Sequence, residues 1–296
     1  MTNSTIKVRE IKDMSNESFF GIAVFNSLAG DCIYLMLPSG KNILFDTGFH
    51  KGDYIINAIK NMPGKLHEIV ITHQHLDHFA SLSRFVKEFK IPKERIHHSG
   101  VAYEKGYIPD EELSSCKEYE GQESVLWHQY YEYIDSDSRW ELIETQNPDL
   151  SIRNLVPQKP RIDFNKVKYH ELNDTSTPMY ITWKNNKILI ASDMTAYSIQ
   201  NMFDQKCLSK IDLYVPSSHG NPKSNPVSML NQLNPDYVCV TDAFVGKGSN
   251  FYEYYQEVLP HADTRSLNVD GSQFYHCTGN KVTRYTLLHD EMPHVT

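Results

Sequence analysis

The chain contains the stretch Ile69-Val-Ile-Thr-His73-Gln-His75-Leu-Asp77-His78, in which an apolar run leads into four potential metal ligands. A β-branched apolar run of this kind predicts a buried strand. The apolar side chains that follow recur at helical spacing: Phe79, Leu82, Phe85, Val86 and Phe89. The four side chains are therefore predicted to lie on a turn between a strand and a helix. Open α/β sheets place their binding sites at such carboxyl ends of strands.

The residue types on this turn favour a metal site. Imidazoles together with a carboxylate suit a borderline metal such as zinc, and mixed nitrogen and oxygen ligand sets also accept manganese or iron. A single histidine would instead favour a polar turn in which the ring caps the helix. The spacing His-x-His-x-Asp-His after an apolar strand predicts a metal site.

The composition limits the class of protein. The chain has 296 residues with 29 basic and 37 acidic side chains, a net charge of −8, and we predict a single domain over residues 1–296. The negative charge argues against a surface that coats nucleic acid in general, although two divalent ions would reverse its sign locally. The five cysteines form no Cys-x-x-Cys pair, and no run reaches membrane-spanning length. We therefore expect a soluble cytoplasmic protein with free thiols and no membrane partner.

The first part of the chain predicts an α/β pattern. Strands are expected over residues 19–25, 32–37 and 42–45, the last two joined by the turn Pro38-Ser-Gly-Lys41. A helix over residues 53–62 precedes the strand that ends at the metal-ligand stretch. Asp46 follows the strand over residues 42–45, in Asp46-Thr47-Gly48.

The last part of the chain repeats this alternation. Strands are expected over residues 179–183, 188–193, 211–215, 237–241, 273–277 and 282–287, and a helix over 250–258. Asp193 ends one of these strands, and His219 follows another in Pro216-Ser-Ser-His219-Gly220. Asn225 and Pro226 are expected to begin a helix as its cap and its first-turn proline.

Residues 99–173 lack clean periodicity and are rich in aromatic side chains, among them Trp127 and Trp140. A structureless loop of this length is unusual in a compact domain, so we expect local helix over residues 123–134. The aromatic rings either pack this segment onto the rest of the protein or contribute to a pocket.

The metal-ligand stretch resembles the signature of the metallo-β-lactamase-fold hydrolases. The resemblance implies a four-layer αββα sandwich, with residues 99–173 as an insertion that covers the site. It also implies that His73 and His75 bind one metal, that Asp77 and His78 bind a second, and that Asp193 bridges both. His219 would be the last ligand. The third ligand of the first metal stays open between His170, Asn173 and Asp174, with His97, His98 and His128 as weaker candidates.

Asp46 also matches this family. The resemblance implies that its carboxylate orients the ligands, because a metal-bound histidine needs an acceptor for its other N–H. A turn cap is the alternative role.

Two further segments narrow the resemblance. Gly30-Asp31 with residues 37–48, and Ser218-His219-Gly220 with Lys223-Ser224-Asn225, are similar to a subgroup of this family. It contains the hydrolase domain of the competence DNA-uptake channel and the teichoic-acid phosphorylcholine esterases. This similarity implies a phosphodiesterase in which two divalent ions, expected to be zinc, share a hydroxide that attacks phosphorus. Small-molecule or other phosphodiesters are the expected substrates, with nucleic acid less favoured.

Two side chains have expected catalytic roles in this mechanism. Asp77 is a ligand first, with any proton transfer secondary, and Lys223 would hold a phosphoryl oxygen. The alternative for Lys223 is a solvated loop side chain. Two other functions compete: a lactone, thioester or β-lactam hydrolase on the same metals, and a non-catalytic metal-binding sensing module.

Overall fold

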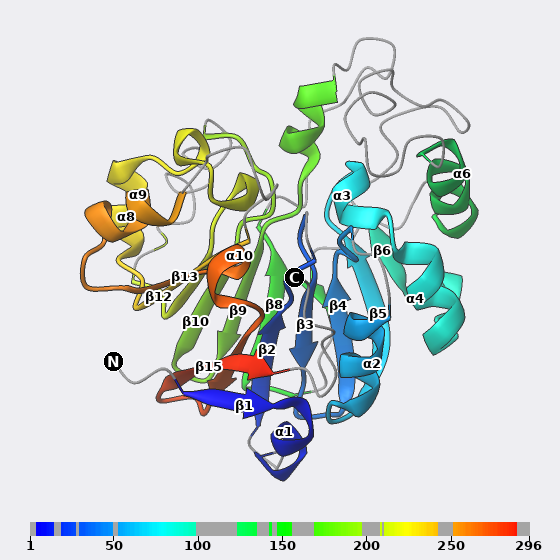
Figure 1. The fold of residues 1–296 in the computed structure, drawn as a ribbon, viewed down its shortest axis with the longest axis horizontal. Helices are drawn as coiled ribbons and strands as arrows, with labels where there is room; N and C mark the ends of the chain where they lie inside the picture. Colours follow the sequence, from blue (N-terminus) through cyan, green and yellow to red (C-terminus); the bar gives the residue numbers. More distant parts are fainter. Residues whose placement is uncertain are drawn as a thin grey trace.

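The computed structural model describes residues 4–14, 19–27, 30–49, 53–98, 123–134, 142–143, 147–155, 169–196, 208, 210–241 and 251–288. In these ranges two β-sheets lie face to face, and helices cover the outer face of each sheet (Figure 1). The predicted four-layer αββα arrangement is confirmed.

The first sheet is built from both ends of the chain. Its strands are β1 (Thr5–Lys7), β2 (Phe20–Val24), β3 (Ile33–Met36), β4 (Lys41–Phe45), β5 (Lys65–Ile71), β6 (Ile96–His98), β14 (Gln273–Cys277) and β15 (Val282–Leu288). They lie in the order β1-β15-β14-β2-β3-β4-β5-β6. β2, β3 and β4 pair antiparallel, whereas β4, β5 and β6 pair parallel. The turn that carries the metal-ligand stretch therefore lies at the carboxyl end of a parallel strand.

The second sheet repeats this change of pairing. Its strands are β7 (Leu142–Ile143), β8 (Leu150–Asn154), β9 (Met179–Trp183), β10 (Asn186–Ile190), β11 (Leu213–Val215), β12 (Tyr237–Val240) and β13 (Asp263–Ser266). They lie in the order β13-β12-β11-β10-β9-β8-β7. β8, β9 and β10 pair antiparallel, and β10 to β13 pair parallel. Asp193 and His219 follow β10 and β11, so they lie at the corresponding edge of this sheet.

Most of the helices pack on the outer faces of the two sheets. The described helices are α1 (Val8–Met14), α2 (Tyr54–Asn61), α3 (Leu76–Phe79), α4 (Leu82–Phe89), α6 (Glu123–Tyr133), α8 (Val227–Leu233), α9 (Phe251–Val258) and α10 (Leu267–Asp270). Short 3-10 helices are η1 (Lys93–Arg95), η3 (Tyr169–Thr175), η4 (Ser218–Gly220) and η5 (Pro222–Ser224). None of the described helices has the length and apolar character needed to cross a membrane.

Alternation along the strands produces three separate apolar cores. On β3, Tyr34 and Met36 face α1, α2 and α4, whereas Ile33 and Leu35 face the second sheet. The third core lies between the second sheet and helices α8 and α9. Because side chains alternate across a strand, a shift by one residue would exchange the two faces of β3. Each fully buried side chain of this size contributes about 1.5–3 kcal/mol, so the cores fix the register of both sheets.

Two features of the fold differ from the expectations. The structure adds β1 and β13, whose sequences are too short and polar to predict strands. β7 pairs with β8 and β8 pairs with β9, so part of the segment 99–173 belongs to the second sheet. The expected helix over residues 123–134 is present as α6, but Trp140 lies outside the described residues.

Buried ion pairs join the two sheets at one edge. Arg284 on β15 donates from Nε to Oδ2 of Asp263 on β13 at 2.8 Å, and Arg265 donates to Oδ1 at 2.9 Å. The side chains of Arg284 and Asp263 are 3% and 10% exposed. Removing one partner from such a pair leaves an uncompensated buried charge.

We predict that Asp263→Ala lowers the free energy of unfolding by about 3–5 kcal/mol, because two guanidinium groups lose their shared acceptor. The matched control is Lys60→Ala, which removes an ion pair with Glu88 whose side chains are 44% exposed. That variant should lose less than about 1 kcal/mol. Urea denaturation of both proteins measures the difference, and equal losses would contradict a structural role for the buried pair.

Candidate metal centre

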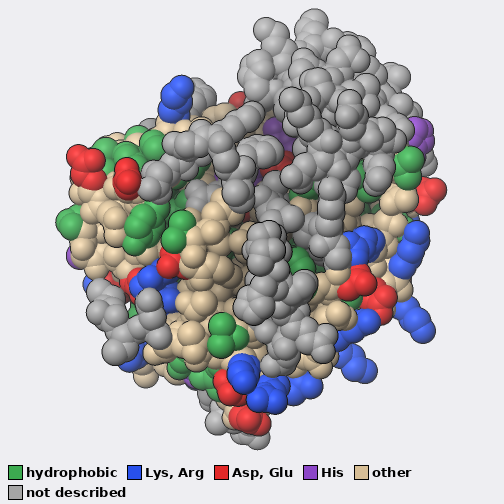
Figure 2. Space-filling model, viewed as in Figure 1, with side chains coloured by type: hydrophobic (Ala, Val, Ile, Leu, Met, Phe, Trp, Pro, Cys, Tyr) green, Lys and Arg blue, Asp and Glu red, His purple; other side chains and the backbone are tan. Residues whose placement is uncertain are grey.

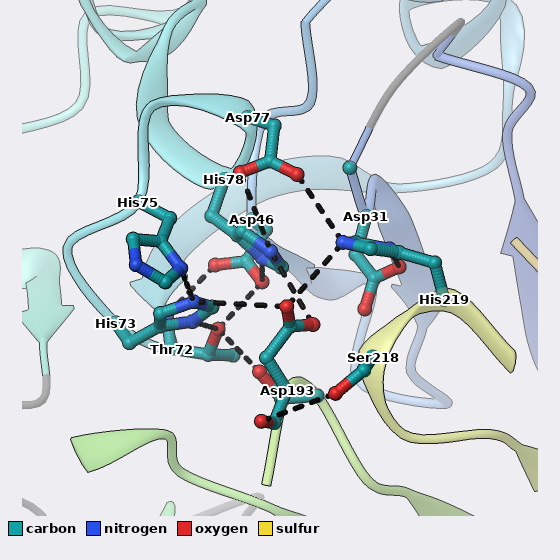
Figure 3. Close-up of polar contacts among 12 residues, drawn as sticks. Asp31, Asp46, Thr72, His73, His75, Asp77, His78, Asp193, Ser218 and His219 are labelled. Atoms are coloured by element: carbon teal, nitrogen blue, oxygen red, sulfur yellow. Dashed lines mark hydrogen bonds and ion pairs between the residues drawn. The ribbon is translucent and has the colours of Figure 1, made fainter. Parts of the chain in front are cut away.

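All six predicted ligands converge where the carboxyl ends of the two sheets meet (Figure 3). His73 and His75 lie on the turn after β5, and Asp77 and His78 lie on α3. The second sheet supplies Asp193 after β10 and His219 on η4. The cluster therefore requires both halves of the chain. Histidine and acidic side chains are visible at the upper edge of the face shown in Figure 2.

Left-handed backbone conformations direct several of these side chains into the cluster. Asp46, Ser192, Ser218 and His219 have φ values of 53°, 51°, 48° and 54°. Such conformations cost of order 1–3 kcal/mol each for residues other than glycine, and they persist only where the surroundings impose them. Each of these residues follows the end of β4, β10 or β11. The strain is thus concentrated at the site.

Among the described residues, four groups could hold a metal ion, and two of them together contain all six predicted ligands. The first of these two groups consists of His73, His75 and Asp193. Nε2 of His73 lies 2.9 Å from Nδ1 of His75, and Oδ2 of Asp193 lies 4.0 Å from the same His73 nitrogen. All three side chains are buried. Their ligand atoms face a common point, as a metal ion would require.

The second group consists of Asp77, His78 and His219. Nε2 of His219 lies 3.2 Å from Oδ2 of Asp77, and Nε2 of His78 lies 3.8 Å from Oδ1 of Asp77. Asp193 approaches this group as well, with its oxygens 3.5 Å from His78 Nε2 and 3.4 Å from His219 Nε2. The Asp193 carboxylate therefore lies between the two groups.

Several atoms that point into the cluster are buried without a hydrogen bond. They are Nε2 of His78, Nε2 of His219 and Oδ1 of Asp193. Buried polar atoms in native proteins nearly always have a partner, and each exception needs an explanation. Imidazole nitrogens and carboxylate oxygens arranged in this way fit divalent cations such as zinc, manganese or iron. The donor set therefore suits two ions, whose identity it does not determine.

The histidines of the cluster differ in the direction of their pKa shifts. Burial alone would lower the pKa of His78, but Asp77, Asp46 and Asp193 raise it well above its ordinary value. The pKa of His219 is raised in the same way, mainly by Asp193. The pKa of His73 is instead lowered well below its usual range by burial and by the neighbouring His78.

The carboxylates respond in the opposite direction. Burial would raise the pKa of Asp77, yet His78 and His219 lower it, and the same two histidines lower the pKa of Asp193. The cluster thus balances its own charges between His78 and His219 on one side and the carboxylates on the other.

Asp46 and Thr72 support the ligands from behind. Asp46 Oδ2 lies 2.7 Å from Nδ1 of His78 and accepts a hydrogen bond from the Thr72 hydroxyl at 2.7 Å. Asp46 Oδ1 accepts from the Thr72 backbone N–H. The Thr72 oxygen also lies 3.2 Å from Nδ1 of His73 and accepts from the Ser192 hydroxyl. Complete burial raises the pKa of the Asp46 carboxyl, and the neighbouring His78 offsets only part of this rise.

The described residues do not supply the third ligand of the first metal. Asn173 Oδ1 is buried without a hydrogen bond, and Asp174 accepts from the Thr195 hydroxyl at 2.6 Å. The His170 side chain lies outside the described residues. Among the weaker candidates, His97 pairs with Glu68, and His128 is exposed on α6. The three-residue groups found among the described side chains contain none of these candidates.

Lys223 lies on η5, next to the segment that carries His219, and its side chain is exposed. Among the described residues, no carboxylate forms an ion pair with its ammonium group. The prediction that Asn225 caps α8 is wrong, because the cap position is Pro226. The buried Asn225 side chain instead bonds Tyr214, both backbone groups of Ser217 and the Asn221 carbonyl. Asn225 therefore closes the loop that presents His219.

Aromatic side chains of α6 pack against the metal-ligand helix. The ring centroids of Trp127 and Tyr130 lie 4.9 and 4.3 Å from that of Phe79, the residue after His78. Trp127 is fully buried. For these two rings the packing interpretation holds.

Sequence reasoning assigned no role in the site to Thr72, Ser192, Asp31 or Thr241. Asp31 Oδ1 and Thr241 Oγ1 both lie 3.3 Å from Nδ1 of His219. The available signal was position, because each of these residues lies beside the end of a predicted strand or, for Asp31, directly before one. Their partners depend on contacts between distant parts of the chain, which periodicity does not predict.

Comparison with known proteins agrees with this site. The sequence profile of the Metallo-beta-lactamase superfamily matches residues 32–241. No curated protein matches the chain.

Similar solved structures include a mutant of the CmlA beta-hydroxylase, at 12% identity and a TM-score of 0.47. They also include the metallo-beta-lactamase fold protein YhfI from Bacillus subtilis, at 9% identity and a TM-score of 0.46. A third is Igni18, a novel metallo hydrolase from Ignicoccus hospitalis, at 11% identity and a TM-score of 0.47. These matches cover 86%, 84% and 84% of this chain and 53%, 96% and 94% of the respective other chains. The chain thus spans about half the length of the CmlA chain.

We predict that Thr72→Val destabilises the metal-free protein by about 1–3 kcal/mol, because Asp46 and Ser192 lose a buried partner. Thr72→Ser keeps the hydroxyl and should retain most of the stability. Thr278→Val is the control, since its exposed hydroxyl bonds only a nearby backbone carbonyl. Urea denaturation measures all three, and a Thr72→Ser variant as unstable as Thr72→Val would show that the hydroxyl is not the cause.

Proposed function

The chain belongs to the metallo-β-lactamase superfamily, and from this premise we propose that it is a metal-dependent phosphodiesterase. The observation that carries the metal-dependent part is the position of Asp193. Its carboxylate lies within 3.5 Å of both His78 and His219 and 4.0 Å from His73. One carboxylate shared by two ligand groups is the arrangement that two neighbouring ions need.

The six side chains divide between the two ions. His73 and His75 would hold the first ion, Asp77, His78 and His219 would hold the second, and Asp193 would contact both. Two such ions supply a water nucleophile near neutral pH and withdraw charge from the oxygens of the substrate. The candidates for a further ligand of the first ion lie in the segment that includes His170.

The protein itself contributes orientation and access. Asp46 and Thr72 keep His78 and His73 turned toward the centre, because each accepts or shares a proton on the outward nitrogen of a ring. The side chain of Asp77 is 20% exposed, whereas those of His73 and His78 are fully buried. Substrate therefore approaches from the side of Asp77. A proton-transfer role for Asp77 would be secondary to ligation.

The phosphodiester part of the proposal rests on two features. The segments around Gly30-Asp31 and Ser218-His219-Gly220 resemble the subgroup that acts on phosphodiesters. Lys223 lies on η5, the short 3-10 helix that follows the one carrying His219. It offers an exposed positive charge that can hold a phosphoryl oxygen. Small soluble phosphodiesters are favoured over nucleic acid, because the net charge of −8 opposes a long polyanion.

We predict that the purified protein binds about two divalent ions per chain. Asp193→Ala should lose at least one of them and most of its activity, since this carboxylate serves both ligand groups. The exposed Asp149→Ala is the control and should keep both ions. Elemental analysis after loading with zinc or manganese provides the count. A wild-type protein that cannot be loaded would disprove the metal centre, and an Asp193→Ala variant with full activity would disprove the shared ligand.

A substrate panel tests the phosphodiester assignment. Loaded protein should hydrolyse bis-nitrophenyl phosphate faster than a lactone, a thioester or a β-lactam. Lys223→Ala should raise the barrier for the phosphodiester by about 1–3 kcal/mol, which is the loss of a charge-assisted contact. Lys60→Ala on α2 should leave the rate unchanged. Faster hydrolysis of a carbonyl substrate with Lys223 dispensable would favour the carbonyl alternative. A fully loaded protein without turnover would favour a sensing module.

A further inference from the structure

We propose that Asp31 is a positioning residue that orients His219 for the second ion, an inference that rests on the metal centre of the proposed function. Asp31 lies just before β3, separated from it by Cys32, and is only 2% exposed. Its Oδ1 lies 3.3 Å from Nδ1 of His219, on the side of the ring away from Asp77 (Figure 3). The contact joins residues that are far apart in the sequence.

The chemistry of this contact fixes the state of the His219 ring. An ionised carboxylate can only accept a hydrogen bond, so Nδ1 of His219 must carry the proton. In the neutral ring the lone pair is then on Nε2, the atom that faces Asp77 and Asp193. A histidine that ligates a metal through one nitrogen commonly donates from the other to a carboxylate, which also raises its basicity.

The neighbouring glycine connects Asp31 to the other half of the same ligand group. Gly30 has a φ of 72°, and a Cβ atom built there would lie 1.8 Å from the backbone oxygen of Asp77. Gly30 therefore lies against α3 while Asp31 contacts His219. Asp77 and His219 are themselves 3.2 Å apart. Gly30 thus contacts Asp77 and Asp31 contacts His219, and these two contacted residues pair with each other across the two halves of the chain.

The arrangement around His219 parallels the one around His78. Asp46 Oδ2 lies 2.7 Å from Nδ1 of His78, so both histidines of the second group have a buried carboxylate behind them. His73, in the first group, has the hydroxyl of Thr72 in this place. Loss of Asp31 should consequently affect the second ion much more than the first.

Thr241 is the competing acceptor, because its hydroxyl also lies 3.3 Å from Nδ1 of His219. The experiment compares Asp31→Ala, Asp31→Asn and Thr241→Val with the wild type. Each full-length protein is freed of metal with a chelator and titrated with Zn²⁺ against a competing indicator, which resolves two binding steps. Thermal unfolding of each metal-free protein is measured in parallel.

Asp31→Ala should weaken one binding step by about 10- to 100-fold and leave the other nearly unchanged. Asp31→Asn, whose amide oxygen can still accept from Nδ1, should lose less affinity than Asp31→Ala. Thr241→Val should retain both steps. In the zinc-loaded wild type, ¹⁵N-histidine NMR should show the proton of His219 on Nδ1, and Asp31→Ala should lose this signal.

Equal weakening of both steps together with a lower melting temperature would overturn the proposal, because it would show general destabilisation. Unchanged binding in Asp31→Ala, or a larger effect of Thr241→Val, would also overturn it. An Asp31→Asn variant as weak as Asp31→Ala would indicate direct ligation and overturn the positioning role. A wild type that shows no two-step binding would instead disprove the metal centre itself.

Discussion

Burial of charge is the constraint on which the rest of this structure depends. Asp31, Asp46, His78 and Asp193 are nearly or fully buried within one small cluster, where an isolated charge would cost several kcal/mol. This cost is offset because each carboxylate faces a histidine or accepts a hydrogen bond from a hydroxyl or a backbone N–H. The carboxyl ends of both sheets have to meet at this point, since neither sheet contains enough partners alone. The three apolar cores then hold the sheets in the one register that keeps the pairs together.

Part of this arrangement could be predicted from sequence because it is local. Four of the ligands lie within His73–His78, and the strands that precede Asp193 and His219 have clear apolar runs. The strands around residues 19–45 also follow from their apolar runs, and the helix over residues 123–134 was expected because a long structureless loop is unusual in a compact domain. Lys223 was identified by its place after His219, and its role stays a prediction.

The remainder could not be predicted because it depends on pairings across the fold. β13 has a polar sequence and forms only because β12 and the Arg284 guanidinium provide its partners. Asn225 carries an ordinary capping signal, yet four hydrogen bonds to the loop before it outweigh the cap. β8 lies in a segment without regular periodicity, and its pairing with β9 makes it part of the sheet. In each case a distant contact decided between local alternatives.

The division of the ligands between two sheets also sets an order of events during synthesis. Asp193 follows His78 by more than a hundred residues, and His219 comes later still. At roughly 5–20 residues per second, the ribosome makes the first four predicted ligands several seconds before it makes Asp193. An ion captured in that interval would be held by one strand end and the short helix α3, with its remaining coordination sites open to water. Final assembly of the six-residue cluster therefore coincides with docking of the second sheet.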